Sequence, residues 1–186
     1  MRTSTQENYR FTVGLLALLA SVFFLFTSLS LAQKGENPQV TRLLQDARDE
    51  AAQLSRDADD MEAMTHSDVS WQSHADMLAT IKDHVNNLGR LVEKMEAARG
   101  SASPWQQQAI DRMIPLMRDL ASNTTAAINH INENKLRPTA GSYPEYLKEN
   151  AETAHDLSNM ISEFVQYGQA RAKLERLEQR LEIAQK

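Results

Sequence analysis

The stretch that decides the fold is NPQVTRLLQDARDEAAQLSRDADDMEAM, residues 37–64. It opens with Asn37 and Pro38, a pair typical of a helix cap followed by the first helical position. Apolar residues then recur at alternating spacings of four and three, which places them on one face of an α-helix. They are Val40, Leu44, Ala47, Ala51, Leu54, Ala58 and Met61. The stretch predicts an amphipathic helix whose alanine-rich face lets a neighbouring helix come close.

Three further stretches show the same periodicity. A polar turn at 65–70 precedes a second helix, which Gly100 is expected to end as a C-terminal stop. Capping boxes that begin at Ser103 and at Ser142 open a third helix, to about Asn134, and a fourth that continues to the end of the chain. The inner stripe of the second helix is predicted to be Trp71, His74, Met77, Ile81, His84, Leu88, Leu91 and Met95.

The fold class predicted from these four helices is all-α, because no strand pattern competes with them. Mostly short connections favour an antiparallel up-down-up-down four-helix bundle. The fourth helix, at about 43 residues, would be roughly 64 Å long, against roughly 46 Å for the third. We therefore expect an extended C-terminal helix whose last turns project beyond the bundle.

The N-terminal segment, residues 1–32, has the order of a secretory signal. A basic start with Arg2 and Arg10 is followed by an apolar run over 11–31 and by small side chains at Ser30 and Ala32. Because an apolar run of this length also crosses a bilayer, an uncleaved membrane anchor is the alternative. The sequence predicts an exported protein, periplasmic or secreted, with the bundle domain at 33–186.

Composition excludes several functions. The chain has no cysteine, so disulfides and thiolate chemistry are absent, and its net charge of −5 without a basic cluster argues against nucleic acid as a partner. It contains no Gly-x-Ser-x-Gly elbow, no Gly-rich phosphate loop and no His-Glu-x-x-His. A non-enzymatic protein is expected.

Histidine and methionine on inward stripes are candidate ligands. His74, Met61, Met77 and His130 are expected near one level of the bundle, where imidazole and thioether groups would suit copper. His84 and Met117 are a second candidate pair, as axial ligands of a non-covalent, b-type haem. The competing interpretation is that these methionines fill the core and that these histidines hydrogen-bond to polar neighbours.

The projecting end of the fourth helix carries Leu174, Leu177 and Leu181 at heptad spacing among charged residues. Such a seam predicts homodimerisation, whereas the alternative is a frayed tail or one packed back on the bundle. The function predicted from these features is that of an exported, non-enzymatic bundle protein of the cell envelope acting through protein binding or self-association. The alternative function is a carrier of copper or haem in the core.

Pro115, inside the third helix, predicts a local kink. By counting along antiparallel neighbours, Gly89 and Gly168 are expected near its level. There they would accommodate the bend or leave room for a small ligand.

Overall fold

The protein is described from a computed structural model over residues 35–184, and this part of the chain is helical without strands. Its four long helices are α2 (Pro38–Ala63), α3 (Trp71–Ala98), α4 (Pro104–Glu133) and α5 (Tyr143–Ala184). Single 3₁₀ turns, η2 (Met64–His66) and η3 (Arg99–Ser101), follow α2 and α3. The all-α prediction is confirmed for this part. The expected signal peptide or anchor lies outside the described residues.

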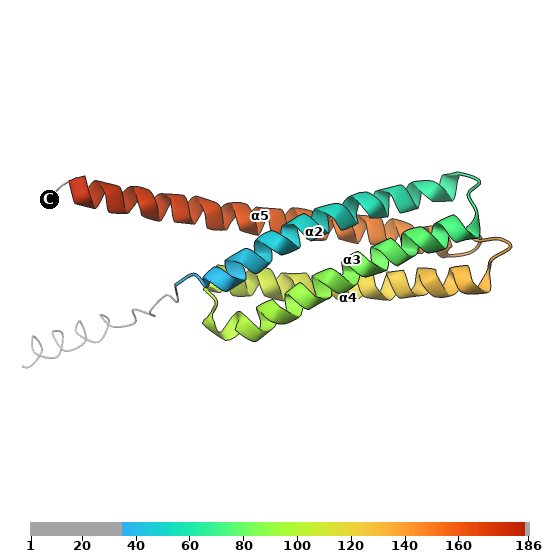
Figure 1. The fold of residues 1–186 in the computed structure, drawn as a ribbon, viewed down its shortest axis with the longest axis horizontal. Coiled ribbons are helices and arrows are strands. Elements are labelled where there is room, and N and C mark those ends of the chain that lie inside the picture. The colour runs from blue at the N-terminus through green and yellow to red at the C-terminus, as the bar shows by residue number, and fades with distance from the viewer. Residues whose placement is uncertain (1–34, 185–186) are drawn as a thin grey trace, which may run out of the picture. The chain divides into compact units, whose positions relative to one another are not determined.

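Hydrogen bonds between helix starts establish the topology. The backbone N–H of Asn37, before α2, donates to the side chain of Gln106 in the first turn of α4. At the other end, the hydroxyl of Tyr143 at the start of α5 lies 3.2 Å from a ring nitrogen of His74 at the start of α3. Helices α2 and α4 thus begin at one end of the bundle and α3 and α5 at the other, so consecutive helices are antiparallel (Figure 1).

The core is formed where each helix packs on two neighbours. Helix α2 packs on α3 and α5, and α4 packs on the same two helices. Burial of these apolar stripes is the main stabilising term, at about 25 cal/mol per Å². The largest fully buried aliphatic side chains are Leu44, Leu54, Met61, Leu78, Ile81, Leu88, Met95, Ile110, Met113, Leu120 and Ile131.

Local caps fix where the helices begin. The Asn37 side chain accepts from the backbone N–H groups of Gln39 and Val40, and Pro38 occupies the first turn. Ser103 and Gln106 form the predicted capping box of α4. Both starts were predicted correctly, because the residues that form these caps lie within four positions of each other in the sequence.

The buried stripe of α3 is rotated from the predicted one. Its interior residues include Leu78, Val85 and Val92, whereas Met77, His84 and Leu91 lie at the edge, only partly buried. Each displaced residue directly precedes one that is buried, and one residue corresponds to about 100° around a helix. Placing Met77 and His84 on the innermost stripe was therefore wrong; the aliphatic neighbours occupy it.

The glycine predictions are confirmed in part. Helix α3 ends at Ala98 and Gly100 lies in the turn η3 that follows, as expected of a stop, but without a left-handed backbone; Gly141 is the one described residue with a positive φ, 62°. A Cβ added to Gly168 would come within 2.8 Å of the Trp105 ring, so Gly168 admits this indole rather than the region around Pro115. At Gly89 the same test finds open space, and α4 continues as helix through Pro115.

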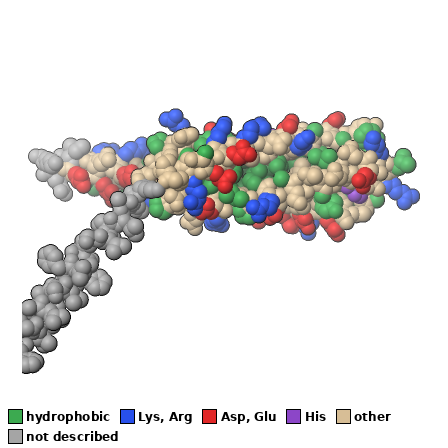
Figure 2. Space-filling model, turned by 90° about the horizontal axis from the view of Figure 1, so that it is seen from below, with side chains coloured by type: hydrophobic (Ala, Val, Ile, Leu, Met, Phe, Trp, Pro, Cys, Tyr) green, Lys and Arg blue, Asp and Glu red, His purple; other side chains and the backbone are tan. Residues whose placement is uncertain are grey.

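Helix α5 is the longest, with 42 residues, and its last turns project beyond the start of α2 (Figure 1). The projecting end predicted from helix lengths is therefore present. Figure 2 shows one face of the molecule, on which Lys and Arg side chains are interspersed with Asp and Glu.

Candidate functional site

The first candidate site is a group of three rings at the end of the bundle where α3 and α5 begin. Tyr143 is fully buried and contacts His74 edge-on at a centroid distance of 5.5 Å. It also stacks on His130 of α4 at 5.2 Å. The structure thus places two of the four predicted copper ligands around one tyrosine.

Burial determines the protonation of these groups. Desolvation lowers the pKa of His74 and raises that of Tyr143 above its usual range, because neither charged form is solvated there. His74 is therefore neutral and Tyr143 keeps its hydroxyl proton. The Nε2 atoms of His74 and His130 are both buried without a hydrogen-bond partner. An unpaired buried polar atom is costly, so these two nitrogens are unusual features of the core.

The two methionines predicted to lie beside these histidines differ in burial. Met61 is fully buried near the end of α2, whereas Met77 lies partly exposed at the edge of α3. Among residues 35–184, no group of three or more His, Asp and Glu side chains is arranged to hold a metal ion.

His84 lies between α3 and α2. Its Nδ1 is 2.8 Å from Glu50 Oε1 and its Nε2 is 2.9 Å from Asp57 Oδ2, and the side chain is 14% exposed. Each ring nitrogen therefore faces a carboxylate oxygen of α2. Haem ligation by His84 and the buried Met117 would require at least one of these two contacts to open, because an imidazole binds iron through a free nitrogen lone pair.

A similar contact joins α5 to α2 and was not predicted. His155 Nδ1 lies 3.0 Å from Ser55 Oγ, and its Nε2 is 2.9 Å from Asp59. The sequence holds one signal for such contacts. Glu50 and Asp57 are seven residues apart and so lie on one helical face, where a histidine of a neighbouring helix can bridge them.

The second candidate site is the outer face of α5. The exposed large apolar side chains of the described residues number five, and four of them are on this helix. Relative exposures are 48% for Tyr167, 56% for Leu174, 39% for Leu177 and 66% for Leu181. The predicted leucine seam therefore has no apolar cover within the described part of the chain, and Tyr167 extends it toward the bundle.

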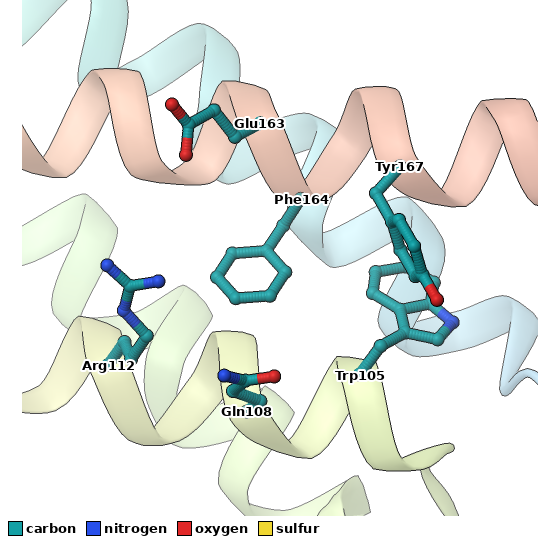
Figure 3. A pocket seen from close by; sticks show the side chains of 6 residues that line it. All are labelled: Trp105, Gln108, Arg112, Glu163, Phe164 and Tyr167. Carbon is teal, nitrogen blue, oxygen red and sulfur yellow. The ribbon is translucent and has the colours of Figure 1, made fainter.

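A shallow pocket of about 380 Å³ lies between α4 and α5, beside the start of this seam. Figure 3 shows Phe164 directed from α5 toward α4, between Arg112 and the paired rings of Trp105 and Tyr167. The guanidinium of Arg112 is 5.7 Å from the Phe164 ring, a cation–π distance. The Trp105 and Tyr167 rings meet edge-on at 5.7 Å. Three of the six side chains that line the pocket are aromatic, and it borders the exposed seam at Tyr167.

Comparison with known proteins gives no relative: no family model, no curated protein and no solved structure matches the chain. Within the described residues, no helix has both the length and the apolarity needed to cross a membrane. Proposals about function therefore depend on the residues themselves.

Proposed function

We propose that this is an exported, non-enzymatic helical-bundle protein of the cell envelope that acts by self-association through the outer face of α5. The observation that carries the proposal is the concentration of exposed apolar side chains on that face, at Tyr167, Leu174, Leu177 and Leu181. A helix that leaves a leucine stripe in water is stabilised when the stripe is covered.

The spacing of these residues supports a helical partner. From Tyr167 the steps to Ala170, Leu174, Leu177 and Leu181 are three, four, three and four, which is the a/d pattern of a coiled coil. About two heptads make a short seam, so we expect a reversible, concentration-dependent complex.

Sedimentation equilibrium tests this proposal on the protein in the form that the cell makes. The mass should rise from one chain toward two as concentration increases, and Leu174→Gln/Leu177→Gln should keep it at one. Leu136→Gln is the matched control, because Leu136 is 97% exposed but lies outside the seam. A mass of one chain up to the solubility limit would refute self-association.

Export is the second part of the proposal and is supported by the order of residues 1–32. Mass spectrometry of the chain from fractionated cells tests it. A mature protein that begins at Gln33 would establish cleavage, and an intact chain in the membrane fraction would establish the anchor over 11–31. Intact chain in the cytosolic fraction would refute export.

A second candidate function, carriage of copper, is favoured by the unpaired Nε2 atoms of His74 and His130 and by a buried methionine, Met61, toward the same end of the bundle. If His74 Nδ1 donates to the Tyr143 oxygen, its Nε2 lone pair is free for a soft metal. Titration with Cu(I), read by bound metal and by the thermal midpoint, tests this function. His130→Gln should abolish binding, with His66→Gln as control, and the absence of stoichiometric copper would exclude it.

A further inference from the structure

The direction of pairing can be argued from where the apolar seam lies on α5. Val165 and Gly168 face the bundle and are buried. Leu174 follows Val165 by nine residues and Leu177 follows Gly168 by nine. Nine residues correspond to about two and a half turns, so the leucines lie on the side of α5 opposite to its bundle-facing stripe.

This opposition removes a steric obstacle to pairing. When two copies join through their seams, each bundle lies on the outer side of its own α5. Side-by-side pairing of two parallel α5 helices therefore leaves both bundles clear of the shared seam. Had the leucines continued the bundle-facing stripe, a parallel partner would meet the start of α2 of the first copy.

The charges beside the seam distinguish the two directions. With Leu174 and Leu181 at position a and Leu177 at position d, Lys173 is at position g and Glu178 is at position e. In a parallel pair, g faces the e position five residues later in the partner, which sets Lys173 against Glu178 twice by symmetry. Neither side chain has an ion pair within the described residues, so both are available.

An antiparallel pair brings g against g and e against e. In the register with the greatest overlap, Lys173 would face Arg180, a repulsive contact, and Arg171 would face Glu178. Arg171 already lies 3.8 Å from Glu36 and 4.0 Å from Glu175 of its own chain. The antiparallel arrangement therefore gains one attraction at the cost of a repulsion and of existing contacts.

We infer that the partner of the α5 seam is a second copy of this chain, bound parallel and in register, with Lys173 of each copy paired with Glu178 of the other. This inference rests on the proposed function. It adds the orientation and the residues that set it.

Charge reversal tests the orientation because the two directions predict opposite results. In a parallel pair, Lys173→Glu sets like charges together twice and should weaken the dimer about ten-fold, as should Glu178→Lys. An equimolar mixture of the two variants should restore wild-type affinity, since both contacts become attractive in the mixed dimer. In an antiparallel pair, Lys173→Glu would face Arg180 and would tighten the dimer instead.

Cross-linking gives an independent test, because the chain has no native cysteine. Leu174→Cys and Leu181→Cys should each form a disulfide with itself under mild oxidation, whereas Gln179→Cys, at position f on the side of α5 away from the seam, should not. One antiparallel register cannot align both seam positions with themselves.

The outcomes separate the inference from the function on which it rests. A wild-type chain that never dimerises refutes both. A dimer in which Lys173→Glu strengthens association, or in which only one seam cysteine cross-links with itself, refutes the parallel orientation alone. A complex of three or more copies refutes the pairing of two.

Discussion

The two parts of α5 differ in where their apolar side chains lie. From Tyr143 to Gly168 its apolar stripe is buried against α2 and α4, while from Gln169 onward its leucines are exposed. The backbone is continuous helix across the boundary. What changes is the side on which the apolar residues lie. The projecting end is therefore not simply a bundle helix that lacks neighbours.

The largest effect is expected in the buried part. Ile161→Ala should lower the free energy of unfolding by about 2–5 kcal/mol, because Ile161 is fully buried and its truncation leaves a cavity. Urea denaturation followed by circular dichroism measures this loss. A change below about 0.5 kcal/mol, the range of surface substitutions, would contradict the contrast between the buried and the exposed part of α5.

The boundary itself is tested at Gly168. Gly168→Ala places a methyl group against the buried Trp105 ring, and overpacking of about 1–3 kcal/mol should exceed the helix propensity gain of about 1 kcal/mol. Gly89→Ala is the matched control, since open space there should leave only the gain. If both variants were equally stabilised, Gly168 would not be required for the packing of Trp105.

The ring cluster where α5 begins adds a pH dependence to the stability of the bundle. Burial lowers the pKa of His74 below 6.5 in the folded state, so the unfolded state binds more protons as the pH falls. Stability should therefore decrease as pH is lowered through about 6.5, and His74→Gln should reduce this dependence. Urea midpoints between pH 5 and 8 measure it, with NMR titration of the His74 ring. Titration of that ring at or above the ordinary value would contradict the prediction.

The smallest effect is expected in the projecting part. Leu181→Ala should change the unfolding free energy of the monomer by less than about 0.5 kcal/mol, because Leu181 is 66% exposed. The measurement is made at a concentration at which sedimentation gives the mass of one chain. A loss comparable with that of Ile161→Ala would mean that the tail packs against the bundle in solution.

The sequence predicted the helices and their starts because the deciding residues lie close together along the chain. The cap at Asn37 and the box of Ser103 and Gln106 are local, and the projecting leucines follow from helix length. Long-range contacts were less predictable. His84 and Val85 are adjacent, and periodicity alone could not choose which faces the core.

The same limit applies to the ring cluster. His74 and His130 were placed at one end of the bundle by counting turns, but Tyr143 follows an irregular loop whose path the sequence does not define. The position of the Tyr143 ring between α3 and α4 therefore could not be predicted from the sequence. The ligand roles predicted for these histidines remain predictions.

Gln106 has a consequence for how uniquely the helices align. Its side chain is fully buried, accepts from the N–H groups of Asn37 and Ser103, and donates to the Asn37 carbonyl and the Thr41 hydroxyl. Repeating stripes of alanine and leucine tolerate an axial shift of seven residues, since one heptad resembles the next. Any such shift would leave the Gln106 amide buried without hydrogen-bond partners. A single polar residue therefore selects one axial register between the diagonal helices α2 and α4.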